Sequence, residues 1–346
     1  MLALQALVVL ATAFSVAAAP GLTLKVEGAS SVTDVDNFKV STILTNTGDE
    51  TLKILNDPLG PLSNLPTDSF SVVNSQGSSA SFAGAKAKYV PAVAAEVGDY
   101  TTLAPGQSIT VNHDLSEAYN LTATGAGTYD VEPRNVFYLV NEKNEISSIH
   151  ARVSKVHKAR VSGRLSKVRP TPTLAKRATY VSCTAARQTI LVEAAAAAQA
   201  YATEAKSFLD ANSATTTRYS TWFGAFTTAR YNTVLSHFTA INSNVFSSFT
   251  YDCSCTRSGT YAYVYPAEFG RIYLCPVFWN VNVTGTDSRG GTLIHESSHF
   301  DANAGGTDDI VYGQTGAKNL AISNPNNAVI NADSHEYFAE NNPFQS

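Results

Sequence analysis

Residues 291–300 read GTLIHESSHF and hold two histidines, His295 and His299, four positions apart, with Glu296 directly after the first. In an α-helix, residues four positions apart lie on the same face, so both imidazoles would point the same way with the glutamate beside them. The stretch therefore predicts a helix that offers two ligands to a zinc ion and a base that can activate water.

A catalytic zinc site also needs a third protein ligand and an open position for water. Asp301 follows His299 by two residues and would face away, about 200° around the helix. Further on, residues 305–313 read GGTDDIVYG, and the two glycines permit a turn that brings the chain back beneath the helix. On spacing alone, either Asp308 or Asp309 could then reach the metal.

The whole chain has 346 residues, 15% of them charged, and a net charge of -4. This composition is globular, and the length is sufficient for two domains. No basic surface argues for nucleic acid, and no apolar run reaches the roughly 18 residues of a membrane span.

Residues 1–19 are apolar and end in three alanines, which is typical of a signal peptide cleaved after Ala19. They lack Lys and Arg, and a buried N-terminal helix is the alternative.

The four cysteines all lie in the second half of the chain, and an even number suits two disulfides in an oxidising compartment. Cys253 and Cys255 are too close along an extended chain to bond to each other. Two pairings remain. We favour Cys183–Cys253 with Cys255–Cys275 over the crossed pairing, because the second bond then closes a compact hairpin of aromatic strands. A zinc site made of all four cysteines would need paired Cys-x-x-Cys spacing, which the chain lacks.

The first half of the chain differs from the second in its residue composition and hydrophobic pattern. Residues 20–150 alternate short β-type runs with turn signals, which predicts an all-β sandwich. They contain no cysteine and no histidine cluster, so we expect no chemistry in them. Residues 151–177 hold nine Lys or Arg and no acidic residue, which favours a solvated linker. This linker ends in the dibasic pair Lys176-Arg177, a signal for secretory processing.

From residue 178 on, alanine-rich and aromatic runs at helical spacing predict two packed helices. A small antiparallel sheet, the helix of the opening motif and two further helices follow. Residues 178–346 are thus expected to form a mostly helical α+β domain that begins at Ala178 or Thr179. Two Asn-x-Thr sequons, at Asn120 and Asn282, are candidate glycosylation sites and agree with export.

The motif HESSH followed by G-T-x-D-x-x-Y-G, at residues 306–313, resembles the aspzincin metallopeptidases, the deuterolysin group. Within this group, TRYSTWFGAF, YDCSC, YAYVYP and NADSHEYFAENNP resemble the fungal peptidyl-Lys metalloendopeptidases across residues 179–346. The resemblance implies that Asp309 is the third zinc ligand and that Tyr312 donates a hydrogen bond to the developing oxyanion. It also implies the disulfide pairing favoured above and a β-rich propeptide in the first half.

Asp333 and Glu336 are i, i+3 neighbours on a predicted helix, so both can face one site. The resemblance gives them the role of gripping a lysine on the C-terminal side of the cleaved bond. Residues 178–346 contain two lysines and residues 1–177 contain ten, which suits a lysine-specific protease with few target sites of its own.

The sequence therefore predicts a secreted zinc metalloendopeptidase that cuts lysine-containing proteins and peptides before lysine, with Glu296 as the general base. We expect it to be made as an inactive precursor and to be monomeric when mature. One alternative is a deuterolysin-type enzyme of broader specificity. Another is a secreted binding protein whose β-sandwich is the active part and whose zinc domain is inert. A role of residues 20–177 as an intramolecular chaperone and inhibitor is compatible with the enzyme.

Overall fold

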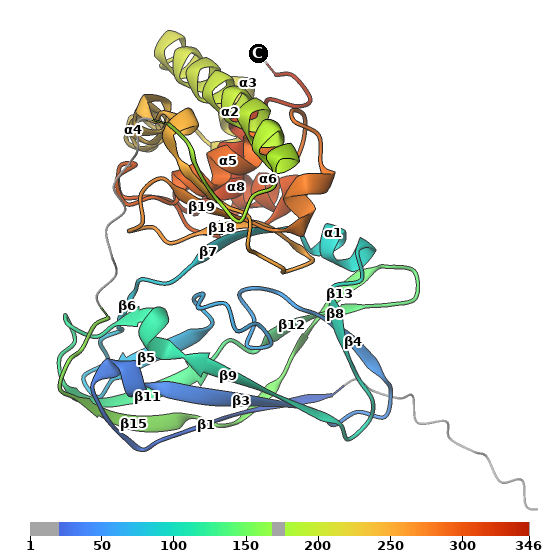
Figure 1. Cartoon of the computed structure of the whole chain (residues 1–346), viewed down its shortest axis with the longest axis vertical. Helices are drawn as coiled ribbons and strands as arrows, with labels where there is room; N and C mark the ends of the chain where they lie inside the picture. Colours follow the sequence, from blue (N-terminus) through green and yellow to red (C-terminus); the bar gives the residue numbers. More distant parts are fainter. Residues whose placement is uncertain (1–20, 168–176, 346) are drawn as a thin grey trace, which may run out of the picture.

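The structure is a computed structural model that describes residues 21–167 and 177–345. Figure 1 shows two domains, which we call the N-terminal domain (residues 21–167) and the C-terminal domain (residues 177–345). None of the helices in these described parts is long and apolar enough to cross a membrane. The predicted signal peptide and Lys176 lie outside the described residues.

Strands dominate the N-terminal domain. They are β1 (Leu22–Gly28), β2 (Ser31–Thr33), β3 (Lys39–Asn46), β4 (Leu52–Leu55), β5 (Phe70–Asn74), β6 (Ser81–Phe82), β7 (Lys86–Tyr89), β8 (Tyr100–Leu103), β9 (Ser108–Asp114), β10 (Tyr119–Asn120), β11 (Gly127–Pro133), β12 (Val136–Val140), β13 (Ile146–His150), β14 (Arg152–Lys155) and β15 (His157–Ser162). Three sheets have the orders β14-β1-β3-β9, β2-β15-β11-β5 and β13-β12-β4-β8, and β6 pairs with β10. Alternate residues such as Val26, Val40 and Val131 point into a shared core.

The structure differs from the expected all-β sandwich in two respects. A short helix, α1 (Pro91–Glu96), interrupts the strands, and β7 pairs with a sheet of the C-terminal domain. The prediction of a linker beginning at residue 151 is also wrong for its first part, because β14 and β15 occupy it. Along β15, His157 and Val161 are buried, whereas Lys158 is exposed. The cationic residues of β14 and β15 thus lie on the exposed faces of these strands.

The C-terminal domain contains the longer helices. They are α2 (Ala185–Ala211), α3 (Thr217–Phe223), α4 (Thr228–Ser243), α5 (Arg289–Ser298), α6 (Gly313–Ser323), α7 (Pro325–Ala328) and α8 (Ala332–Glu340). Small buried residues of α2, including Ala194 and Ala198, let α5 pack closely against it. A Cβ added at Gly290 on α5 would lie only 2.9 Å from Ala197 Cβ, so this approach depends on the glycine.

The second of the two helices predicted after residue 178 is divided into α3 and α4. Gly224 follows α3 with a φ of 77°. A Cβ at this position would lie 2.1 Å from the Ala321 backbone oxygen, so only glycine fits where the chain turns against α6. Thr227 then caps α4 by accepting a hydrogen bond from Arg230 N at 3.3 Å.

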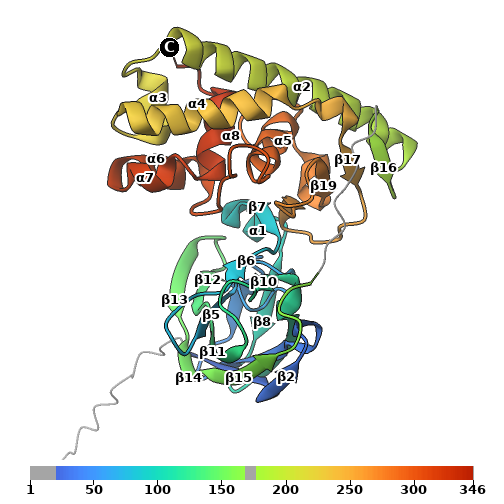
Figure 2. The same cartoon turned by 90° about the vertical axis from the view of Figure 1, so that its left-hand side faces the viewer.

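The sheet of the C-terminal domain is mixed rather than antiparallel. Its strands are β16 (Thr179–Val181), β17 (Thr250–Asp252), β19 (Arg271–Leu274), β18 (Thr260–Val264) and β7, in that order. The first two pairs are parallel. The chain between β16 and β17 runs through α2, α3 and α4, and the chain between β17 and β19 passes through β18, before each parallel partner is reached. Figures 1 and 2 both show β7 on the face of this domain that is turned toward the N-terminal domain.

Two disulfides fix the ends of these strands, and the pairing favoured from the sequence is confirmed. Cys183 is bonded to Cys253 and Cys255 to Cys275. Cys275 immediately follows β19, so the second bond closes the segment that contains β18 and β19. This segment forms the edge against which β7 pairs.

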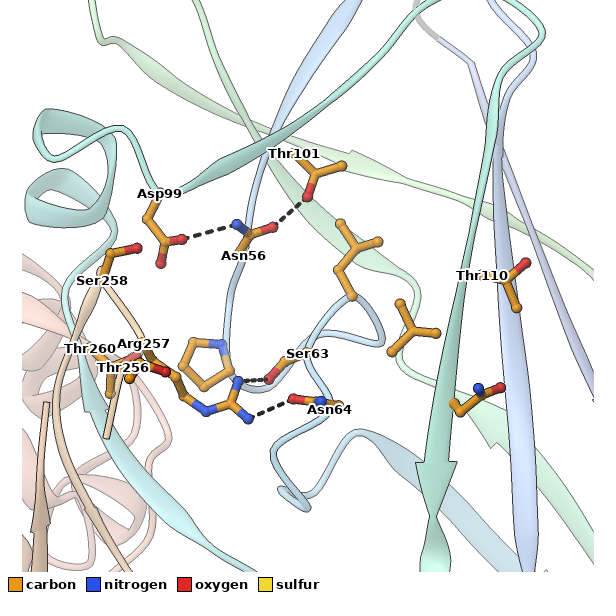
Figure 3. A pocket seen from close by; sticks show the side chains of 14 residues that line it. Asn56, Ser63, Asn64, Asp99, Thr101, Thr110, Thr256, Arg257, Ser258 and Thr260 are labelled. Atoms are coloured by element: carbon orange, nitrogen blue, oxygen red, sulfur yellow. Dashed lines mark hydrogen bonds between the residues drawn. The ribbon is translucent and has the colours of Figure 1, made fainter. Parts of the chain in front are cut away.

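The two domains also touch beside a pocket of about 580 Å³, shown in Figure 3. The Arg257 guanidinium, from the loop between β17 and β18, donates to Ser63 Oγ at 3.2 Å and to Asn64 Oδ1 at 2.6 Å. Nearby, Gly259 N donates to Asp99 Oδ2 at 2.9 Å. The N-terminal domain is therefore docked on the C-terminal domain at more than the strand β7.

Candidate active site

Helix α5 carries the His-Glu-x-x-His motif, as the sequence predicts. Ser288 caps it by accepting a hydrogen bond from Gly291 N at 3.0 Å. His295, Glu296 and His299 are all fully buried. They lie where α5 packs against α8 and β7, so the motif is covered by a strand of the N-terminal domain.

The chain reverses directly after α5. Gly306 has a φ of 78°, and a Cβ there would lie 2.6 Å from the His299 backbone oxygen, so the tight return requires glycine. Thr307 N then donates to Ser298 O at 2.9 Å and ties the returning segment to the end of the helix. This turn carries the next two residues, both aspartates, back to the motif.

Of these two aspartates, only Asp309 faces the histidines. Its Oδ1 lies 3.1 Å from His295 Nε2 and 3.3 Å from His299 Nε2. Asp308 is more exposed, and its carboxylate pairs with Lys86 Nζ at 2.7 Å. The structure thus brings together the three residues that the resemblance assigns to zinc, and their ligand atoms all lie within 4.8 Å of one another.

The opposite nitrogen of each histidine is also engaged. His299 Nδ1 lies 3.0 Å from Thr307 O, and His295 Nδ1 lies 2.8 Å from Asp333 Oδ1. A carbonyl oxygen and a carboxylate can act only as acceptors, so they favour the tautomers in which both Nε2 lone pairs point inward. Two lone pairs and the Asp309 carboxylate then converge with no donor between them, an arrangement that fits a bound cation such as Zn²⁺.

Glu296 lies beside this group and does not belong to it. Its Oε1 accepts a hydrogen bond from Lys88 N at 3.1 Å, and its Oε2 is buried without a partner among the described residues. Burial raises the pKa of Glu296 to about 8. A carboxyl group with a pKa near neutrality can both accept and return a proton, as general acid-base catalysis requires.

Tyr312 also contacts the site, from the loop before α6. The loop before it is held by Asn331 Oδ1, which accepts from Ile310 N and Val311 N at 3.1 Å each. The Tyr312 hydroxyl donates to the Ala87 carbonyl oxygen at 3.0 Å. Burial and the Asp309 carboxylate raise the pKa of Tyr312 well above its usual range, so the hydroxyl keeps its proton and remains a donor.

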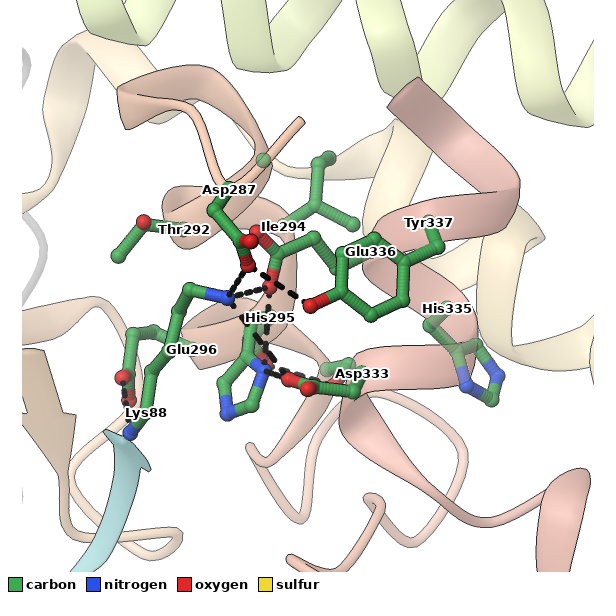
Figure 4. A network of polar contacts seen from close by, with 12 residues as sticks. Lys88, Asp287, Thr292, Ile294, His295, Glu296, Asp333, His335, Glu336 and Tyr337 are labelled. Atoms are coloured by element: carbon green, nitrogen blue, oxygen red, sulfur yellow. Dashed lines mark hydrogen bonds and ion pairs between the residues drawn. The ribbon is translucent and has the colours of Figure 1, made fainter. Parts of the chain in front are cut away.

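A lysine of the N-terminal domain fills the adjoining acidic pocket, which Figure 4 shows. The Lys88 side chain is fully buried, and its Nζ lies 2.6 Å from Glu336 Oε2 and 2.9 Å from Asp287 Oδ1. Asp333 Oδ1 is farther away, at 3.8 Å. Three carboxylates thus surround one ammonium group.

Aromatic rings line the same pocket. Lys88 Nζ lies 4.9 Å from the ring centre of Tyr261 and 5.6 Å from that of Tyr337, and the Tyr337 hydroxyl donates to Asp287 Oδ1 at 2.7 Å. Burial alone would lower the pKa of Lys88, but Glu336 and Asp287 raise it well above its usual range. The pocket therefore stabilises a charged primary amine.

Comparison with known proteins agrees with this geometry. Residues 208–340 match the aspzincin family, described as lysine-specific metallo-endopeptidase. A peptidyl-Lys metalloendopeptidase of Grifola frondosa is 54% identical over 338 residues, which cover 96% of this chain and 97% of the relative. One of Armillaria mellea is 52% identical over 340 residues, with coverage of 97% and 96%. This chain belongs to the aspzincin family.

A solved structure, titled a zinc peptidase from Grifola frondosa, is 56% identical, covers 47% of this chain and 100% of its own, and has a TM-score of 0.47. As a member of the aspzincin family, this chain is a zinc metalloendopeptidase. The sequence prediction of the enzyme class and of its metal is thus confirmed.

Two residues of this aspzincin site were not found from the sequence. Asp287 directly precedes the cap of α5, and no motif spacing points to it. Its backbone N and that of Ser288 donate to the Glu340 carboxylate, at 3.1 and 2.8 Å, which fixes the carboxylate of Asp287 in the pocket. Lys88 lies in the domain where we expected no chemistry, and the structure corrects this expectation. Its signal was the alternation in AKAKY, which presents two lysines on one face of a strand.

Proposed function

We propose that this chain is a secreted endopeptidase that hydrolyses the peptide bond on the N-terminal side of lysine and is made as an inactive precursor. One observation carries this proposal: a lysine already lies in the acidic pocket, with the carbonyl group before it at the catalytic candidates. Lys88 Nζ is 2.6 Å from Glu336 Oε2, while the Ala87 carbonyl oxygen accepts from Tyr312. A substrate bound in the same way would present an Xaa-Lys bond to the site.

In this proposal, His295, His299 and Asp309 hold the zinc ion. When bound, zinc supplies a Lewis acid for the scissile carbonyl and lowers the pKa of water. Glu296 takes a proton from the attacking water and passes it to the leaving amine. Tyr312 donates a hydrogen bond to the carbonyl oxygen as negative charge develops on it.

Lysine selectivity is assigned to the acidic pocket. The distances support Glu336 and Asp287 as the main partners of the substrate ammonium, at 2.6 and 2.9 Å from Lys88 Nζ. Asp333, expected from the resemblance to grip lysine, lies closer to His295 Nδ1 than to Lys88 Nζ, and we assign it mainly to holding that histidine. A buried site built for a charged donor rejects an analogue that lacks it, because its carboxylates would remain unpaired.

Several features support secretion and processing. The two disulfides suit an oxidising compartment. Of the two sequons, Asn282 is exposed and Asn120 is half-buried. The proposed precursor is cut at Lys176-Arg177, and the mature chain, starting at Ala178 or Thr179, acts as a monomer on proteins and peptides that contain lysine.

The test uses the processed enzyme and three peptides that differ only at one residue: lysine, arginine or acetyl-lysine. We expect cleavage before lysine, and a fall in kcat/KM of about 100-fold or more with acetyl-lysine, because the charge that the pocket pairs with is removed. Glu336→Gln and Asp287→Asn should each lower kcat/KM for the lysine peptide, whereas Glu193→Gln, at an exposed position of α2, should not. Equal cleavage of the three peptides would overturn lysine specificity.

A further inference from the structure

Strand β7 lies in the candidate active site as an extended peptide. It pairs antiparallel with β18, the strand that would otherwise form the edge of the sheet beside the catalytic helix. In this register Lys88 is opposite Ala262 and Ala87 is opposite Tyr263. Backbone pairing of an extended segment with a sheet edge is a general way of binding peptides, in which pockets read alternate side chains.

The peptide bond between Ala87 and Lys88 faces the catalytic candidates with both of its polar groups. The Ala87 carbonyl oxygen accepts from the Tyr312 hydroxyl at 3.0 Å, and Lys88 N donates to Glu296 Oε1 at 3.1 Å. On the acyl side, Ala87 N donates to Asp309 Oδ2 at 2.8 Å. The oxyanion donor and the acid that would protonate the leaving amine are therefore at opposite ends of one amide.

We propose that β7 is the precursor's own first substrate, and that the precursor begins its activation by hydrolysing the Ala87–Lys88 bond within the same molecule. This inference rests on the proposed cleavage before lysine. The oxygen of a water molecule bonds to the Ala87 carbonyl carbon, and the bond from this carbon to Lys88 N breaks. A proton of the water passes through Glu296 to Lys88 N. The products are a carboxylate at Ala87 and a new amino terminus at Lys88.

Before this cut, β7 excludes other peptides, because its backbone occupies the edge of β18 and Lys88 fills the acidic pocket. After it, the strand consists of two ends, each attached to the N-terminal domain on one side only. Each end keeps only part of the contacts and is free to leave the cleft, because the tether that held the whole strand in place is broken. The same residues thus account for both inhibition and its release.

The register selects between two similar bonds. The sequence AKAKY contains Ala85–Lys86 and Ala87–Lys88, and both are Xaa-Lys bonds. Lys86 Nζ donates to the Thr307 backbone oxygen at 2.5 Å and pairs with Asp308, outside the acidic pocket. Only the second bond is placed for cleavage.

The first experiment follows the full-length precursor after zinc is added to the metal-free protein. Intact mass and N-terminal analysis should reveal a fragment that begins at Lys88, formed at a rate independent of protein concentration. This fragment should be absent in Glu296→Gln and in Lys88→Ala, and should still form in the matched variant Lys86→Ala. A first cut at Ala85–Lys86, or full activation with Ala87–Lys88 intact, would overturn the inference.

The second experiment requires no catalysis. In the metal-free wild-type precursor, acetylation by a lysine-reactive reagent should modify Lys88 at least tenfold more slowly than the exposed Lys25 and Lys143, because the Lys88 side chain is fully buried. Equal rates would show that Lys88 is not held in the pocket. The proposed function is tested separately by the processed enzyme: if it cuts an added Xaa-Lys peptide while the precursor leaves Ala87–Lys88 uncut, only the further inference fails.

Discussion

Asp333 Oδ1 lies 2.8 Å from His295 Nδ1, on the side of the imidazole opposite to Asp309. The other oxygen of Asp333 accepts a hydrogen bond from Gly313 N at 2.6 Å. A carboxylate held in this way fixes the ring orientation and increases the basicity of the nitrogen that faces the metal. The residue expected to bind the substrate lysine therefore also contacts His295, the histidine that we propose as a zinc ligand.

Asp333→Asn should weaken zinc binding about 10- to 100-fold, the usual cost of losing such a partner of a metal-bound histidine. The measurement is competition for zinc between the processed enzyme and a chelating dye. Asp210→Asn, a change of the same kind at an exposed position of α2, should leave the affinity unchanged. Wild-type affinity in Asp333→Asn would contradict the role assigned to this carboxylate.

Tyr312→Phe should lower kcat about 100- to 1,000-fold, because a donor aimed at the developing oxyanion acts mainly in the transition state. KM should change little. Steady-state kinetics with a lysine peptide check this, and circular dichroism confirms that the variant is folded. A decrease of less than threefold would mean that the hydroxyl does not stabilise the oxyanion.

Arg218 connects α3 to the end of α8. Its guanidinium is fully buried, donates to the Phe338 backbone oxygen through Nε at 3.0 Å and Nη2 at 2.6 Å, and pairs with Glu204. Arg218→Met should cost about 2–3 kcal/mol of unfolding free energy, because it leaves a buried carbonyl group without donors. Glu204→Gln should cost less than about 1 kcal/mol, because this carboxylate is half exposed. Urea unfolding of the processed enzyme measures both, and equal losses would refute this ranking.

Acid should destabilise the C-terminal domain through a buried histidine. His237 Nδ1 lies 3.0 Å from His335 Nε2, and burial lowers the pKa of His237 to about 4. In the unfolded chain this histidine takes up a proton near pH 6.5, whereas in the folded protein it does so only near pH 4. The unfolded state is therefore increasingly favoured as the pH falls from 6.5 to 4. The resulting decrease in the free energy of unfolding should reach about 3 kcal/mol below pH 4.

Urea unfolding of wild type and His237→Asn at several pH values between 7 and 4 tests this prediction. The variant should lose less unfolding free energy on acidification, because it lacks the group that titrates, whatever its stability at pH 7. Parallel curves would show that His237 does not contribute.

Local patterns in the sequence predicted much of the catalytic helix and its return loop. The spacing of His295 and His299 is a property of one helix, and Gly306 marks the turn that follows. The choice of Asp309 over Asp308 needed the resemblance, because spacing left both open. The α2 helix was predictable for the same local reason, since its alanines repeat at helical spacing.

The occupation of the cleft was not predictable in this way. Lys88 meets β18 through a strand pairing between residues more than 170 positions apart, and no local pattern specifies the partner of a short strand. Asp287 is placed by the Glu340 carboxylate from the far end of α8, again a long-range contact. The linker predicted where β14 and β15 lie is an error of the opposite kind. The number of charged residues in this segment outweighed the alternation of buried and exposed positions that marks a strand.

The main prediction is that the processed enzyme requires a metal and cuts before lysine. It is tested most directly by digesting a denatured protein with this enzyme, with chelator, without chelator, and with zinc restored, and by identifying every new terminus by mass spectrometry. We expect new amino termini that are lysine throughout, lost with chelator and regained with zinc. New termini at other residues, or cleavage that persists in chelator, would contradict it.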